Sequence, residues 1–293
     1  MPGESVVPSE NLENHHRRMA QAVYSNHINA MLTMKRIIRS LTKRRSAYLT
    51  DKALERLNIQ CTGLGLNTGM PSDGSEIFIR PFQTTKIHSI LEEIQPWHEY
   101  QMTYDRSFGR YSSAQGILCC IYAWLTCTRR DPLPSLIRHT DWDVRQMEYD
   151  EGERLCRYPR PPSFRSPYWD VAEVLDKMDG LTPHVSCLLN DDAPLGDAQL
   201  SNAEVWCILA ITYRRFRQRE YRNHRFIPVT IISASDMQVR IVQGYVDAQG
   251  DCVRVRKSPI LDFEDFEQAR KHMEVILSWC IGETVGDTKL KTT

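Results

Sequence analysis

The stretch that decides the fold reads SNAEVWCILAITYRRFRQREY at residues 201–221, then FIPVTIISASDMQVRIVQGYV at 226–246 and CVRVR at 252–256. Ser201 and Glu204 match a capping box, in which each side chain satisfies a backbone amide at the start of a helix. Valine and isoleucine dominate the segments 226–233, 237–246 and 252–256, and turn residues separate them. The pattern predicts a helix followed by a three-stranded antiparallel meander.

A final helix follows the meander, because apolar residues from Phe263 to Cys280 recur at helical spacing and Gly282 stands at the position of a C-terminal cap. Another helix is expected to open at Ser166-Pro167, with the cap first and proline next, and to run to about Met178.

Four helices are expected in the N-terminal part, near residues 11–45, 50–58, 84–95 and 112–126. The last of these is the most apolar segment and is expected to be buried on nearly all sides. A glycine-rich loop at 61–75 and a short strand at 76–80 separate the second helix from the third. Trp142 falls in a polar stretch and is expected at the surface or in a pocket.

The fold class is therefore α+β, with a helical N-terminal part packed against a C-terminal helix–three-stranded antiparallel meander–helix unit. The expected divisions are a disordered N-terminus at 1–10, a mainly helical part at 11–128, a proline-rich connection at 129–165 and an α+β part at 166–288. We expect one compact domain overall.

Composition restricts the function class. The chain has 293 residues with a formal net charge of zero, so no global field attracts it to nucleic acid or an anionic membrane. No apolar run is long enough to span a bilayer. Nine cysteines, an odd number, and the absence of a secretory signal favour free thiols in a reducing compartment. We expect a soluble protein of the cytoplasm or the nucleus.

A resemblance covers roughly the last 95 residues. It is carried by the segments 201–204, 222–229, 240–245, 256–263 and 282–288. These segments resemble a broad group of uncharacterised proteins from filamentous fungi. The resemblance implies a fungal source and a shared structural unit, but no activity. Some proteins of this kind are encoded beside pathways of specialised (secondary) metabolism, which makes an accessory role there a hypothesis.

The candidates for catalysis are few. His139, Asp141 and Asp143 alternate, so an extended segment would point them to one side, where they could meet a cation. His184 and Cys187 are close enough in sequence to form a thiol–imidazole pair. A charged loop and a buried thiol explain the same residues without function. We expect no cofactor and no metal.

Two runs are strongly basic. One spans 35–45, and the other contains six arginines interleaved with aromatic residues: Arg214, Arg215, Arg217, Arg219, Arg222 and Arg225. Arginines next to aromatic rings can hold phosphates and stack on bases. Cations at the end of a helix also stabilise its dipole without any ligand, and we favour this second interpretation.

Three functions stay open. We rank first a non-catalytic module that binds a protein partner or regulates it, because good folding signals come without a recognisable catalytic pattern. An enzyme whose site assembles from distant residues is the alternative, and a pocket that gathers His139, Asp141, Asp143, His184 or Cys187 would favour it. Nucleic-acid binding ranks last, and it requires both basic runs on one face.

Overall fold

The computed structural model of the protein describes residues 9–44, 46–94, 110–126, 135–145, 168–247 and 252–290. For residues 9–23, 26, 94, 110 and 111 it describes the backbone only. Of the predicted disordered N-terminus at 1–10, residues 1–8 lie outside these residues, and the prediction is wrong for residues 9 and 10, which belong to the first helix. Most of the predicted connection at 129–165 also lies outside the described residues. Within that connection, 135–145 contains a 3-10 turn, η3 (Leu136–His139), and a strand, β4 (Trp142–Arg145).

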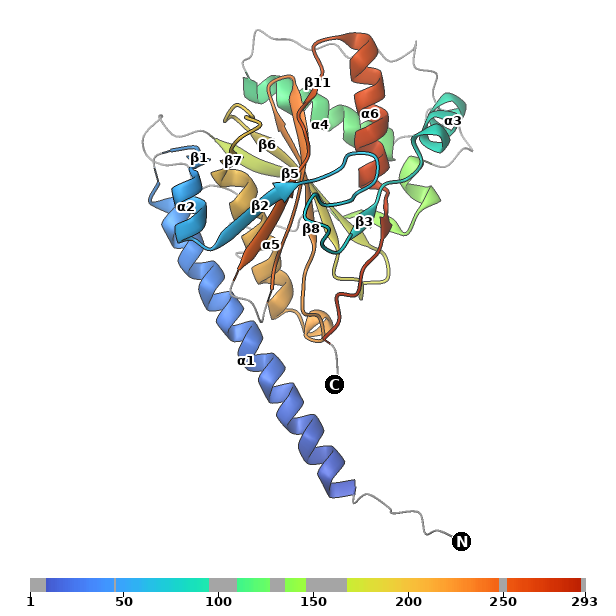
Figure 1. Cartoon of the computed structure of the whole chain (residues 1–293). Coiled ribbons are helices and arrows are strands. Elements are labelled where there is room, and N and C mark those ends of the chain that lie inside the picture. Colours follow the sequence, from blue (N-terminus) through green and yellow to red (C-terminus); the bar gives the residue numbers. More distant parts are fainter. Residues whose placement is uncertain are drawn as a thin grey trace.

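The described residues form one mixed sheet of eight strands, in the order β2-β10-β9-β8-β6-β5-β4, with β11 paired to β9 (Figure 1). The other strands of this sheet are β2 (Ile59–Gly63), β5 (Trp169–Lys177), β6 (Val185–Asp191), β8 (Val229–Ser235), β9 (Gln238–Val246), β10 (Val253–Lys257) and β11 (Leu261–Asp262). Two neighbouring pairs, β6 with β8 and β2 with β10, are parallel. A parallel pair needs a crossover connection, which helix α5 (Asn202–Arg217) supplies between β6 and β8.

Helices cover both faces of the sheet. Helices α1 (Ser9–Thr42), α2 (Asp51–Arg56) and α5 contribute to one apolar cluster, and α3 (Thr84–Ile94), α4 (Arg110–Thr126) and α6 (Phe266–Cys280) contribute to the other. Successive residues of a central strand pack alternately into the two clusters. In β9, for example, Val242 packs with α5 while Ile241 packs on the opposite side.

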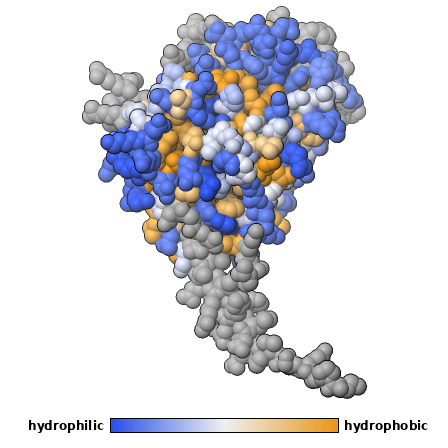
Figure 2. All heavy atoms as spheres, in the orientation of Figure 1, coloured by the Kyte–Doolittle hydropathy of each residue, from blue (hydrophilic) through white to orange (hydrophobic). Residues whose placement is uncertain are grey.

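Smaller elements complete the two ends of the sheet. Strand β1 (Tyr48–Leu49) pairs with β7 (Leu200–Ser201), and β3 (Ile79–Arg80) pairs with β12 (Glu283–Thr284). A 3-10 turn, η5 (Arg219–Tyr221), follows α5. On the visible face, hydrophilic residues gather over α6 and α2, and apolar residues show between them (Figure 2).

Helix α1 packs along α5 in the antiparallel sense. The His27 ring stacks on Phe216, near the end of α5, with ring centroids 4.5 Å apart. The amide of Asn202, at the start of α5, donates to the carbonyl of Ala47 at 2.7 Å, just after α1 ends. The N-terminal half of α1 projects beyond the body of the protein (Figure 1).

Local chemistry explains where the helices start. The Ser201 hydroxyl accepts from the Glu204 amide at 3.1 Å, and the Glu204 carboxylate accepts from the Ser201 amide at 2.9 Å, so the predicted capping box is confirmed. The Thr50 hydroxyl accepts from the Ala53 amide at 3.3 Å and caps α2. The predicted helices at 84–95 and 112–126 are confirmed as α3 and α4.

The mixture of helices and strands is confirmed, but the separate three-stranded meander is wrong. The three predicted strands are β8, β9 and β10, and they pair antiparallel inside the eight-stranded sheet. Their outer edges are completed by β2 from the N-terminal part and by β6, β5 and β4. The backbone N–H and C=O groups along the edges of a buried strand need partners, and distant parts of the chain supply these neighbouring strands.

The helix predicted at 166–178 is also wrong, because 169–177 forms the strand β5. Ser166 and Pro167 lie outside the described residues. Pairing with β4 on one side and β6 on the other overrides the local helical signal. The predicted loop at 61–75 begins too early, since residues 61–63 belong to β2.

Two single residues, Trp142 and Cys119, also differ from expectation, while Gly282 stands at the predicted position. Trp142 is 1% exposed rather than at the surface, and its indole nitrogen donates to the carbonyl of Gly282 at 2.8 Å. Cys119 on α4 is exposed, so that helix is not buried on all sides. Gly282 follows the C-cap residue Ile281 of α6. A Cβ atom at Gly282 would lie 2.6 Å from the Ile79 side chain, so close packing requires this glycine.

Candidate functional site

The first three catalytic candidates lie at the surface near β4. His139 ends η3 and is exposed. Asp141 is exposed and forms an ion pair with Lys177 of β5. Asp143 accepts a hydrogen bond from the amide of Val144 at 3.0 Å. Both carboxylates therefore make contacts with residues of β4 and β5, at one edge of the sheet.

The other two candidates are buried in different surroundings. The His184 ring donates from Nε2 to the carbonyl of Val285 at 3.1 Å, and burial lowers the pKa of His184 to about 4, so the ring is neutral near pH 7. Cys187 lies in the core, with its Sγ 3.6 Å from Sγ of Cys207. In the described part of the chain, no hydrogen bond or ion pair joins any two of the five candidates. No three or more His, Cys, Asp or Glu side chains among the described residues are placed to hold a metal ion.

The arginine run divides into two groups. Arg214, Arg217, Arg219 and Arg222 are exposed. Arg215 is buried and donates to Asp176 of β5 and to the hydroxyl of Tyr221. Arg225 donates to both carboxylate oxygens of Asp247, at 3.0 and 2.6 Å. Two of the six predicted anion contacts, Arg215 and Arg225, are therefore engaged in ion pairs within the fold.

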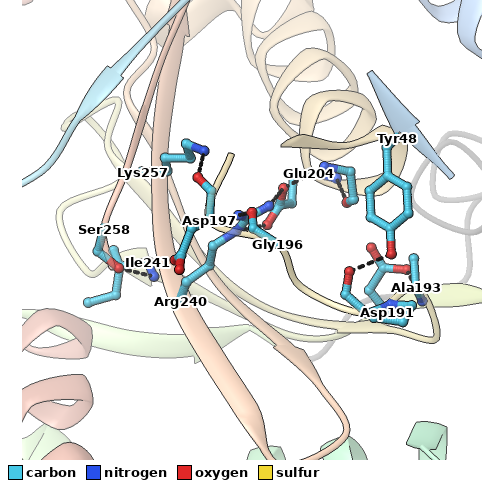
Figure 3. A network of polar contacts seen from close by, with 12 residues as sticks. Tyr48, Asp191, Ala193, Gly196, Asp197, Glu204, Arg240, Ile241, Lys257 and Ser258 are labelled. Carbon is cyan, nitrogen blue, oxygen red and sulfur yellow. Dashed lines mark hydrogen bonds and ion pairs between the residues drawn. The ribbon is translucent and has the colours of Figure 1, made fainter. Parts of the chain in front are cut away.

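A buried polar network lies where α5 begins, beside the carboxyl ends of β6 and β8 (Figure 3). Arg240 of β9 donates to both oxygens of Glu204, at 2.7 and 2.5 Å, and the two side chains are 1% and 0% exposed. Ligands of open α/β sheets commonly bind at the carboxyl ends of parallel strands. Here both Glu204 oxygens already accept from Arg240, and one also accepts from the Ser201 amide.

The same network fixes the loop between β6 and β7. Arg240 also donates to the carbonyl of Gly196 at 2.8 Å, and Lys257 of β10 donates to the carbonyl of Asp197. The Tyr48 hydroxyl donates to the carbonyl of Pro194 at 2.6 Å. Tyr48, Arg240 and Lys257 belong to β1, β9 and β10, so the network connects these three strands to one loop (Figure 3). Two of the three donors are charged, which strengthens their hydrogen bonds. In this arrangement the network stabilises the fold by holding the loop between β6 and β7 in place.

Asp191 at the end of β6 gives the network a pH dependence. Its carboxylate accepts from the Ala193 amide at 3.0 Å, and burial raises the pKa of Asp191 to about 7. An unfolded aspartate has a pKa of about 3.9, so between these values the folded state binds the extra proton. Stability from this group is therefore present at low pH and is lost as the pH rises from about 4 to about 7.

Replacing Asp191 by asparagine is expected to remove this dependence, because the amide resembles the protonated carboxyl. The free energy of unfolding of Asp191→Asn minus that of the wild type should grow with pH between about 4 and 7, by at most about 1.4 kcal/mol per pH unit. Urea unfolding at a series of pH values measures it. The exposed Asp197→Asn serves as the control, and a difference that stays constant with pH would refute the assignment.

The outer side of α1 carries a different kind of surface. Tyr24 and Leu32 are 59% and 58% exposed, and Ile28 between them is half-buried. Lys35 and Arg39 continue the same row and are exposed. Steps of three and four residues place all five side chains on one side of the helix. We call Tyr24, Ile28, Leu32, Lys35 and Arg39 the outer stripe.

The outer stripe reaches α5 through an aromatic ring. The Lys35 ammonium lies 5.3 Å from the ring centroid of Tyr213, and the Arg217 guanidinium lies 6.0 Å from it. The two basic runs therefore meet at Tyr213. Among the described residues, no acidic side chain forms an ion pair with Lys35, Arg39 or Arg217. Sequence reasoning noted these cations but could not show that Leu32 lies exposed beside them.

No family model matches the chain, and no curated protein or solved structure matches it either. The resemblance to fungal proteins therefore stays a prediction. Among the helices of the described residues, none combines the length and the apolar character that crossing a bilayer requires.

Proposed function

We propose that the protein is an interaction module that binds an acidic, amphipathic segment of a partner protein along the outer stripe of α1. The observation that carries this proposal is the juxtaposition on one helix face of two large exposed apolar side chains, Tyr24 and Leu32, with two cations, Lys35 and Arg39. The opposite side of α1, including Met34 and Leu41, is occupied by the core.

The chemistry of the stripe favours one kind of partner. Apolar residues at successive helical turns match the apolar anchors of an amphipathic helix, which is a common form of peptide recognition. The adjoining cations Lys35 and Arg39 attract carboxylates and fix the orientation of the segment. Nucleic acid offers no aliphatic face that would cover Leu32, and the formal net charge of zero gives no general attraction to it.

The size of the effect follows from burial. Covering a leucine side chain contributes about 1.5–3 kcal/mol, and about 1.4 kcal/mol is a factor of ten in affinity. Replacing Leu32 by aspartate removes that burial and places a carboxylate opposite the acidic partner. We therefore expect the variant Leu32→Asp with Arg39→Glu to bind at least tenfold more weakly. Both side chains are exposed, so the variant should fold.

Fluorescence anisotropy tests the proposal. The probe is a fluorescein-labelled helical peptide of about 20 residues, about 30 Å long, with leucines on one side and glutamates on the other. The control variant Leu181→Asp with Lys271→Glu makes the same changes at exposed positions elsewhere, since Leu181 is 64% exposed and Lys271 is on the surface of α6. The control should bind the probe as the wild type does.

Two outcomes would overturn the proposal. Equal affinity of the wild type and the outer-stripe variant would show that the peptide binds elsewhere or without specificity. Tight binding of a labelled DNA duplex, lost in the outer-stripe variant while the peptide does not bind, would assign the surface to nucleic acid. In that case Tyr213, with Lys35 and Arg217 on its ring, would be the contact point.

A further inference from the structure

A cavity of about 230 Å³ lies on the other side of the sheet, between α4 and the strands β5 and β6. Its walls include Leu118 of α4 and the aromatic residue Tyr122. The carboxylates of Asp170 and Glu173 also line it. The cavity therefore combines an apolar wall with negative charge, and the described residues that line it include no lysine, arginine or histidine.

A β-bulge sets the direction of Glu173. The register between β5 and β6 shifts between Val171 and Glu173, so that Val171 lies opposite Leu189 and Glu173 lies opposite Leu188. Leu188 belongs to the apolar cluster on the α4 side. An extra residue in one strand reverses the side to which the next side chain points. The bulge thus turns Glu173 toward α4 and the cavity.

No residue that the structure describes forms an ion pair with Glu173. The side chain is half-buried, and burial raises the pKa of Glu173. Cys119 and Glu173 both line the cavity, and partial burial, then the charge of Glu173, raise the pKa of the Cys119 thiol. Among the described residues, Glu173 has no hydrogen-bond or ion-pair partner. A bound cation would offset the cost of keeping this carboxylate ionised.

We propose that this cavity binds a small organic cation, a primary amine on a short apolar or aromatic body, with Glu173 as its counter-ion. The ammonium group sits at Glu173, with Asp170 as the second carboxylate of the lining. The apolar body lies against Leu118. The Tyr122 ring, which is 36% exposed, offers its face to the cation or to the body.

Benzylamine is the probe that tests this site, because it combines an ammonium group with a ring of suitable size. A ligand of about eight heavy atoms is expected to bind with roughly millimolar affinity. Isothermal titration with the full chain should show saturable binding of benzylamine and at least tenfold weaker binding of the neutral isostere benzyl alcohol. The variant Glu173→Gln should weaken benzylamine at least tenfold and leave benzyl alcohol unchanged. Glu267→Gln, an exposed change on α6, should behave as the wild type.

The exposed thiol of Cys119 gives an independent measure of occupancy. Alkylation by iodoacetamide, followed at Cys119 by peptide mass spectrometry, should slow when benzylamine is present, and the slowing should disappear in Glu173→Gln. The thiol of Cys61, which lies on the opposite side of the sheet in β2, is the internal control. Equal binding of the amine and the alcohol, equal binding in Glu173→Gln, or no protection of Cys119 under saturating benzylamine would overturn the proposal.

Discussion

Replacing Glu204 by alanine is expected to lower the free energy of unfolding by about 3–5 kcal/mol, the cost of leaving a buried charge without its partner. Arg240 would lose both of its carboxylate contacts while its side chain stays 1% exposed. The Ser201 amide would lose its acceptor in the capping box as well. Urea unfolding followed by circular dichroism measures the loss.

A double variant separates charge from packing. Changing Glu204 to leucine and Arg240 to methionine replaces the ion pair by apolar groups of similar volume, and such replacements of buried pairs are often neutral or stabilising. We expect the double variant to be more stable than Glu204→Ala, although Gly196 loses a donor to its carbonyl. The single variants Glu204→Leu and Arg240→Met complete the comparison. If the double variant loses at least as much free energy of unfolding as the two single variants together, the two side chains are not coupled.

Replacing Trp142 by alanine is expected to cost about 3–5 kcal/mol, because the change opens a cavity under β4. The indole ring is packed in the apolar cluster on the α4 and α6 side of the sheet, and the Lys177 ammonium lies 4.8 Å from its centroid. Its hydrogen bond to the Gly282 carbonyl joins the edge strand to the segment that follows α6. Thermal and urea unfolding both measure this effect.

Phenylalanine at position 142 is the matched variant. It keeps an aromatic ring in the core and removes the donor to the Gly282 carbonyl, so it should cost less than alanine, about 1–3 kcal/mol. If Trp142→Ala were as stable as the wild type, the ring would not contribute to the core and the placement of β4 at the sheet edge would be wrong.

Local signals in the sequence predicted the elements that local chemistry determines. The capping box at Ser201 and the cap at Thr50 are hydrogen bonds within one turn of helix, so their residues are adjacent in the sequence. The strands at 229–257 are separated by turn residues and pair with their sequence neighbours. In such segments the sequence pattern and the final contacts involve the same residues.

Elements that depend on distant partners could not be predicted in this way. Every residue of β6 is buried, so this strand lacks the alternation that marks a half-buried strand. Strand β5 forms through pairing with β4 and β6, while its own residues also fit a helix. Strand β2 completes the sheet beside β10, from almost two hundred positions earlier in the sequence.

The candidate surfaces show the same limit. The basic run that contains Lys35 and Arg39 was visible in the sequence, but the exposure of Leu32 depends on which side of α1 the core occupies. The cavity depends on the bulge that turns Glu173 toward α4, and a register shift leaves no mark in composition. Cys119 was assigned to a buried helix because the residues around it are apolar, and the structure places it at the cavity instead.

The most direct measurement of the proposed function is a methyl NMR titration of the full chain with the acidic helical peptide. We expect the methyl signals of Leu32 and Ile28 to shift and saturate together, while those of Leu181 and Leu118 stay in place. Saturable shifts at Leu181 or Leu118 without any change at Leu32 would contradict it, and so would a peptide that shifts none of these signals.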